Sequence, residues 1–190
     1  MKKERAEKEK RRKKYQERKK LEERQGLELE HYEALLEIIG EEQTFVQSRM
    51  RLASSLLFVT GARIGEVLAL KKNQVENLFS KQRPFFAFDR TKRGAKEQKA
   101  FLSHEGKEII TQRIADYKIV MKYSKPNNDF LFAAKQSETD HLSGQHFTSE
   151  MNSYLKILGE RFNRKFTSHS FRKRYITHLW KSFGDIRLFS

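Results

Sequence analysis

The 190-residue sequence contains no cysteine and no long hydrophobic run. The absence of cysteine excludes disulfides, thiolate metal sites and a cysteine nucleophile. No stretch approaches the roughly 20 apolar residues of a membrane span, and the charged N-terminus lacks the apolar stretch of a secretory signal. We therefore expect a soluble chain that is not secreted by that route and has no membrane partner.

Positive charge is what the sequence has in excess. Lys and Arg number 40 against 25 acidic residues, which gives a net charge of +15 and a pI near 10. Such a balance favours a polyanionic partner, of which nucleic acid is the commonest. Charge alone does not separate a DNA-binding protein from an RNA-associated one.

The charge is divided between a leader and the rest of the chain. Residues 1–24 hold 13 Lys or Arg and 6 Glu, a net +7, which leaves +8 for the remainder. The leader has too few apolar side chains to bury a face, although its residue types favour helix. We expect residues 1–26 to be a basic arm, helical or disordered, that follows phosphates or has no specific role. One folded domain is expected over residues 27–190.

Apolar residues recur at helical spacing along this domain. The spacing predicts helices over residues 27–39, 45–59, 104–123 and 147–162, a short helix after Gly61, and a last helix capped by Thr167 or Ser168. Aromatic-rich extended stretches flank the turn-like KRGAKE, which predicts a β-hairpin, and FLFAA is a candidate short strand. The expected fold class is α+β, mainly helical with a small antiparallel hairpin.

The first candidate functional residue is Arg63, in the segment LLFVTGARIGEVLAL. Arg63 lies on a turn between two apolar helical segments, and its planar guanidinium can grip two oxygens of one phosphate. Glu66, one helical turn later, can hold that guanidinium in place. Taken alone, the pair is better explained as a surface Arg beside a surface Glu.

Two further motifs carry basic side chains to places where an anion can bind. Lys92, in TKRGAKE, lies at the end of a strand beside a tight turn, where it can swing into a groove or simply touch a phosphate. His169 and Arg172, in TSHSFRKRYITHL, lie one turn apart on the same face at the start of a helix. A helix N-terminus attracts anions, although an isolated H-x-x-R arises often by chance.

In combination the motifs are specific. Their order, an Arg in a TGxRxxE turn, a Lys in a hairpin and HxxR opening a helix, resembles the tyrosine recombinase (phage integrase) family, whose active site is shared with type IB topoisomerases. The resemblance covers residues 27–190. It implies the fold of the family's catalytic domain without its last helices, double-stranded DNA as partner, and DNA integration or site-specific recombination as the process.

The resemblance also implies a role for each residue. Arg63 and Arg172 would clamp the scissile phosphate, His169 would hydrogen-bond it, Lys92 would protonate the departing 5′ oxygen, and Glu66 would orient Arg63. No metal or cofactor is expected, because the two guanidiniums supply the positive charge. Further contacts to the DNA backbone are expected from Lys13, Lys14, Lys71, Lys72, Arg93, Lys96, Lys173 and Arg174.

The family's reaction also needs a tyrosine nucleophile, which the resemblance places after the end of this sequence. The closing WKSFGDIRLFS resembles the approach to the third conserved box, so we expect a catalytic domain that is truncated before its nucleophile. Tyr175 stands where the family has a packing residue, and Tyr117 and Tyr154 lie on apolar stripes. None of the three is expected to attack phosphorus.

Three functions are therefore open. The first is a DNA-binding protein that has the phosphate clamp but cannot cleave alone. The second is a recombinase subunit whose tyrosine comes in trans, from another protomer or a tyrosine-bearing fragment. The third is a non-catalytic basic protein associated with RNA or DNA, in which the motif order is coincidence. We expect an intracellular, DNA-associated location, in the cytoplasm or nucleoid or in an organelle such as a plastid or mitochondrion. The many Lys and Phe residues point to an A/T-rich genome, such as that of an organelle or a mobile element.

Overall fold

Helix α3 (Phe45–Thr60) is the central element of the structure, and every residue from Ser48 to Thr60 is buried. The structure is a computed structural model that describes residues 26–79, 85–89, 97–134 and 137–183. The Thr44 hydroxyl caps the start of α3 by accepting from the N–H of Gln47, and Gly61 ends the helix in left-handed backbone with φ +61°. The helix and the glycine break predicted here are confirmed.

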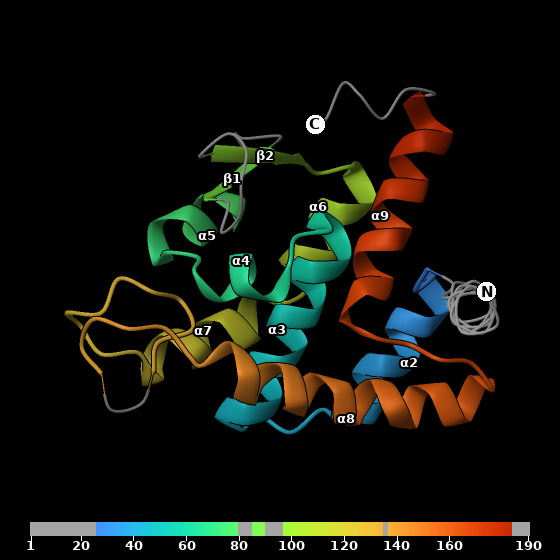
Figure 1. The fold of residues 1–190 in the computed structure, drawn as a ribbon. Helices are drawn as coiled ribbons and strands as arrows, with labels where there is room; N and C mark the ends of the chain where they lie inside the picture. The colour runs from blue at the N-terminus through green and yellow to red at the C-terminus, as the bar shows by residue number, and fades with distance from the viewer. Residues whose placement is uncertain (1–25, 80–84, 90–96, 135–136, 184–190) are drawn as a thin grey trace, which may run out of the picture.

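Besides the short α4 (Ile64–Leu68) that follows it, four longer helices among the described residues pack directly against α3 (Figure 1). They are α2 (Leu29–Ile39), α6 (His104–Thr111), α7 (Ile114–Tyr123) and α9 (Ser168–Phe183). Figure 1 shows α8 (Gly144–Phe162) lying across the bottom of the molecule, and it contacts α2, α4 and α9. Together these helices bury one apolar core, whose largest fully buried side chains are Phe58, Phe132, Phe147 and Phe171.

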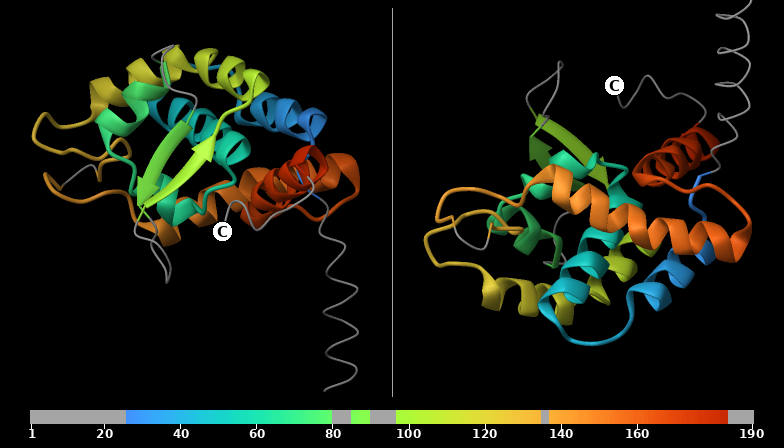
Figure 2. Two further views of the ribbon diagram at one scale, coloured as in Figure 1. Left: turned by 90° about the horizontal axis from the view of Figure 1, so that it is seen from above. Right: turned by 60° about the horizontal axis from the view of Figure 1, so that its bottom comes forward.

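A short segment links this helical layer to a pair of strands. It contains α4 (Ile64–Leu68) and α5 (Lys72–Phe79), and both contact strand β1 (Phe85–Asp89). Strand β2 (Glu97–Phe101) pairs antiparallel with β1, with Phe85 opposite Phe101 and Asp89 opposite Glu97. Seen from above in Figure 2, the two strands lie side by side over the helices. The described part of the chain is therefore mainly helical, with little strand.

The region from residue 104 to 123 differs from its prediction as one helix. Helix α6 ends at Thr111 and α7 begins at Ile114, with Arg113 between them at φ −93° and ψ 13°. Ile110 and Ile114 keep a spacing of four residues across the break, so the apolar periodicity continues where the backbone does not.

Two other local predictions are corrected. The expected strand over FLFAA does not form, because Phe130 and Ala133 each make a single bridge, to Lys71 and His141, with a turn between them. Helix α5 was not predicted, since KNQVENLF offers few apolar positions to mark a period. At the last helix, Thr167 is the residue that precedes α9, and its N–H donates to the Ser170 hydroxyl at 3.1 Å.

A charged pair lies inside the core between α3 and α7. The Arg51 side chain is 7% exposed, and its Nε donates to both carboxylate oxygens of Asp116 at 3.0 and 3.2 Å. The same guanidinium donates to the carbonyls of Gly40 and Glu42, beyond the end of α2. Arg51 thus joins three parts of the fold, and the Asp116 carboxylate compensates its positive charge inside the protein.

His31 of α2 is also completely buried. Its Nδ1 accepts from the backbone N–H of Glu28 at 3.0 Å, and its ring lies against Phe162 and Phe166 with centroids 4.6 and 4.9 Å apart. Burial lowers the pKa of His31 below its ordinary 6.5. His31 is therefore a neutral packing residue that fixes the start of α2 against the segment after α8.

None of the described helices has the length and apolar character needed to cross a membrane.

Candidate phosphate-binding site

Arg63 lies on the turn between α3 and α4, where its backbone is extended, with φ −78° and ψ 154°. Glu66 accepts from the Arg63 backbone N–H at 2.7 Å with one carboxylate oxygen and from Arg63 Nη1 at 2.8 Å with the other. The Glu66 side chain is fully buried, whereas that of Arg63 is 39% exposed. One side of the guanidinium is thus fixed by a buried carboxylate while the rest faces solvent.

Arg172 reaches the same turn from α9. Its Nη1 donates to the carbonyl oxygen of Gly61 at 2.9 Å, across 111 positions of sequence. Helix α9 packs tightly here, because a Cβ added to Gly61 would lie 2.5 to 2.6 Å from the side chain of Tyr175. The structure therefore brings Arg172 to a carbonyl only two residues before Arg63.

His169 stands in the first turn of α9, exposed to solvent and three residues before Arg172. Side chains at this spacing share one face of a helix. The first N–H groups of a helix lack carbonyl partners within it and carry partial positive charge. The Leu27 N–H donates to the Ser170 carbonyl at 3.1 Å, which ties the start of α9 to the start of α2.

The charges of this cluster do not cancel. Arg63 and Glu66 together carry no net charge, so the excess positive charge comes from Arg172 and from the N-terminal end of α9. A phosphate group can accept hydrogen bonds from two guanidiniums at once. Here each guanidinium already donates on one edge to a protein acceptor, Arg63 to Glu66 and Arg172 to the Gly61 carbonyl. Within the described ranges, no three His, Asp or Glu side chains gather as a metal site requires.

The other basic residues predicted to contact DNA differ in their surroundings. Lys71 and Lys173 are exposed, whereas Lys72 is half-buried and its Nζ donates to the Lys125 carbonyl at 2.9 Å. The predicted Lys13, Lys14, Lys92, Arg93 and Lys96 lie outside the described residues.

Arg174 does not lie where a phosphate contact requires it. Its side chain is 13% exposed, and its guanidinium carbon lies 3.8 Å from the centre of the Phe58 ring. Its Nη2 lies 3.9 Å from Oε1 of Glu105. Burial lowers the pKa of Arg174 from its ordinary value. We correct the expectation on this ground: Arg174 packs α9 against α3, and it is left out of the contacts proposed below. The sequence already indicated that Arg174 lies on the buried face of α9, because it follows the apolar Phe171, which is fully buried, by three residues.

The three tyrosines considered as nucleophiles are all held by packing. Tyr175 lies on Gly61, Tyr154 packs partly buried against the core, and Tyr117 meets the ring of Phe79 with centroids 4.8 Å apart. Burial raises the pKa of Tyr117, which disfavours its phenolate form.

Comparison with known proteins agrees with this architecture. A family model described as the phage integrase family matches residues 25–189. The crystal structure of XerA recombinase is similar in fold, with a TM-score of 0.62 and 22% identity over 86% of this chain and 53% of that one. XerH site-specific recombinase, bound to difH substrate in a pre-cleavage complex, gives a TM-score of 0.63 and 23% identity over 86% of this chain and 44% of that one. The chain thus spans about half the length of these two structures. No curated protein matches the sequence.

Proposed function

Because the chain belongs to the phage integrase family of tyrosine recombinases, we propose that residues 27–190 bind the backbone of double-stranded DNA at the turn after α3 and the start of α9. The observation that carries the proposal is the hydrogen bond from Arg172 to the Gly61 carbonyl. It joins the two motifs that the family places around one phosphate. The basic residues 1–26 are proposed to act as an arm that follows the DNA backbone.

Each residue of the site has a proposed task. Arg63 and Arg172 neutralise the charge that builds on the non-bridging oxygens of the scissile phosphate, and Glu66 keeps Arg63 in one orientation. His169 hydrogen-bonds the same phosphate and assists proton transfer. Lys92 protonates the departing 5′ oxygen. Further backbone contacts are proposed for Lys13, Lys14, Lys71, Lys72, Arg93, Lys96 and Lys173.

Contacts of this kind predict how the protein binds. Phosphate contacts fix a protein on the duplex without reading its bases, so sequence specificity in this part is weak. Each neutralised phosphate releases counterions, so affinity falls steeply as salt rises. Duplex DNA should be preferred to RNA under the same conditions, and equal binding of both would favour the basic RNA-associated protein instead.

Strand cleavage is proposed to need a tyrosine from outside these 190 residues. The support is that Tyr117, Tyr154 and Tyr175 are all held by packing, Tyr117 against Phe79, Tyr154 against the core and Tyr175 against Gly61. The tyrosine can come from sequence that continues this chain, from another protomer or from a separate fragment. In each case the clamp in this chain activates the phosphate that the tyrosine attacks.

A nicked suicide duplex tests this proposal on a denaturing gel. The 190-residue chain alone should form no covalent protein–DNA adduct, and adding a tyrosine-bearing fragment of the same family should produce one. Arg63→Ala or Arg172→Ala should abolish that adduct, whereas Arg161→Ala should leave it unchanged. Arg161 is a matched control because it is an exposed arginine on α8 that pairs with Glu37 of α2 at 2.7 Å. An adduct formed by the chain alone would overturn the proposal that the nucleophile is external.

A further inference from the structure

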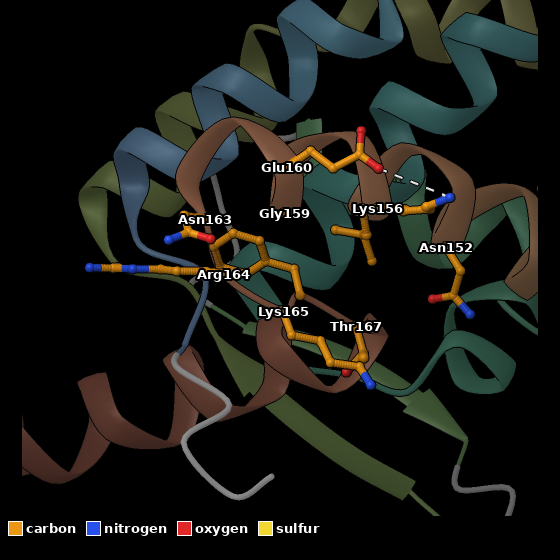
Figure 3. A pocket seen from close by; sticks show the side chains of 10 residues that line it. Asn152, Lys156, Gly159, Glu160, Asn163, Arg164, Lys165 and Thr167 are labelled. Atoms are coloured by element: carbon orange, nitrogen blue, oxygen red, sulfur yellow. Dashed lines mark ion pairs between the residues drawn. The ribbon is translucent and has the colours of Figure 1, made fainter. Parts of the chain in front are cut away.

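A second basic surface lies beside the start of α9. It is a hollow of about 650 Å³ between the C-terminal half of α8 and the connection to α9 (Figure 3). We name it the α8–α9 pocket. Figure 1 shows the connection running back along α8 to the base of α9, whose first turn carries His169. Its lining consists of Asn152, Leu155, Lys156, Gly159, Glu160, Asn163, Arg164, Lys165, Phe166 and Thr167.

The polar wall of the pocket carries a net positive charge. Three of its side chains are cationic, Lys156, Arg164 and Lys165, and one is a carboxylate, Glu160. Lys156 lies 4.0 Å from Glu160, but both are exposed, so this ion pair neutralises little. No ion pair or hydrogen bond joins the Lys165 side chain to another described residue. Figure 3 shows Lys165 beside Thr167 on one wall, and Lys156 with Glu160 on the other.

The floor of the pocket is apolar and fixed by close backbone packing. Leu155 is fully buried and Phe166 is 6% exposed. Asn163 ends α8 in left-handed backbone, with φ +49°, and the chain then returns so close to the helix that a Cβ on Gly159 would lie 2.5 Å from the Arg164 carbonyl. The Thr167 hydroxyl is buried at the edge of the pocket and has no hydrogen-bond partner among the residues that the structure describes. The shape of the pocket floor is therefore set by the fold.

We propose that the α8–α9 pocket holds a sugar–phosphate unit of the bound DNA strand, next to the phosphate at the clamp. The inference rests on the proposed function. Thr167 precedes His169 by two residues, so their Cα atoms are at most about 7 Å apart. Each DNA strand carries one phosphate per roughly 3.4 Å of helix axis, so a strand held at His169 has neighbouring phosphates within reach of Lys165.

The chemistry of the walls fits this occupant. The ammonium groups of Lys156 and Lys165 match the charge of a phosphodiester, and the apolar floor formed by Leu155 and Phe166 matches the face of a deoxyribose. Contacts to phosphate and sugar position a protein along the duplex. The pocket would then set the direction in which the strand leaves the clamp, which Arg63 and Arg172 alone do not define.

Binding of the full 190-residue chain to duplex DNA tests the inference. The double variant Lys156→Gln/Lys165→Gln removes two charges from the pocket, and Lys118→Gln/Lys122→Gln removes two from exposed positions on α7. The pocket variant should bind about tenfold more weakly near 0.1 M salt, and the slope of log affinity against log salt should fall by about 1.8. The α7 variant should keep the wild-type slope. Equal melting temperatures would show that both variants fold.

A crosslinking experiment locates the contact. Because the chain contains no cysteine, Lys165→Cys provides a single thiol for a photoreactive group. This position should crosslink to duplex DNA in high yield, and Lys118→Cys should not. If the wild-type protein binds DNA and Arg63→Ala weakens binding, but the pocket variant matches the α7 variant, the pocket inference is wrong and the proposed function stands. An acidic protein segment as occupant would give that same result. If the wild-type protein does not bind duplex DNA, the proposed function itself fails.

Discussion

Substituting alanine at Gly61 should separate the two arginines of the clamp. A new Cβ would lie 2.5 Å from Cδ1 of Tyr175 and 2.6 Å from its Cβ. Rotation of the Tyr175 side chain moves Cδ1 but not Cβ, so the clash is relieved only if α9 moves away from the turn. That movement breaks the hydrogen bond from Arg172 to the Gly61 carbonyl and displaces Arg172 from Arg63.

Two costs set the size of the effect. Gly61 has φ +61°, in the left-handed region, where a residue with a Cβ costs about 1–2 kcal/mol. Forcing an extra methyl into a packed contact costs about 1–3 kcal/mol. Together Gly61→Ala should lower the free energy of unfolding by about 2–5 kcal/mol, which moves a urea midpoint by about 1–2 M.

Urea unfolding and duplex-DNA binding should both be measured for Gly61→Ala, with Gly65→Ala as the matched control. Gly65 lies in α4 and a Cβ there would meet no atom within 4 Å. Gly65→Ala should be neutral or stabilise the protein by up to about 1 kcal/mol, and it should bind DNA as the wild type does. If Gly61→Ala unfolds and binds like the wild type, α9 is not held against the turn in the way described.

Three further predictions concern buried polar groups. Glu66→Gln should lower the free energy of unfolding by about 1–3 kcal/mol, measured with urea. The carboxylate now accepts hydrogen bonds from two N–H groups of Arg63, and in the variant the amide NH₂ would face one of them. Asp116→Asn should cost about 3–5 kcal/mol in the same assay, since it leaves the Arg51 charge in the core without its carboxylate. For His31, burial lowers the pKa, so the folded state binds fewer protons than the unfolded state. Its contribution to stability is present above pH 6.5 and is lost as the pH falls below that value.

Each of these has a control in the same chain. Glu76→Gln and Asp129→Asn make the same chemical changes at exposed positions and should have little effect on unfolding. For His31, urea midpoints near about pH 7.5 and about pH 5.5 should differ more in the wild type than in His31→Gln. Equal losses in both proteins, or controls as destabilised as their buried counterparts, would contradict the predictions.

Local sequence was sufficient for the residues whose partners lie nearby in the chain. Arg63 and Glu66 are three positions apart, and the ion pair expected between them forms at the start of α4. His169 and Arg172 have the same spacing on α9, which places them on one face of that helix. The end of α3 at Gly61 was equally local, because glycine is the residue that most readily adopts the left-handed conformation of a helix end.

Contacts between distant parts of the chain could not be derived in that way. Nothing near Arg172 in sequence shows that its partner is the Gly61 carbonyl, since a backbone acceptor has no residue type to recognise. The α8–α9 pocket was missed for a similar reason, because Lys156 and Lys165 come together only when the chain reverses at Asn163. Arg174 was misjudged from its charge, although its position after Phe171 already marked the buried face of α9.

We proposed that Arg63 and Arg172 grip one DNA phosphate together, and the salt dependence of duplex binding reports on this contact. Affinity should be measured between about 50 and 200 mM salt for the wild type, the double variant Arg63→Ala/Arg172→Ala and the control Arg161→Ala. The double variant should lose about 1–2 from the slope of log affinity against log salt and bind at least about tenfold more weakly, while the control keeps the wild-type slope. A double variant with the slope and affinity of the wild type would contradict the account.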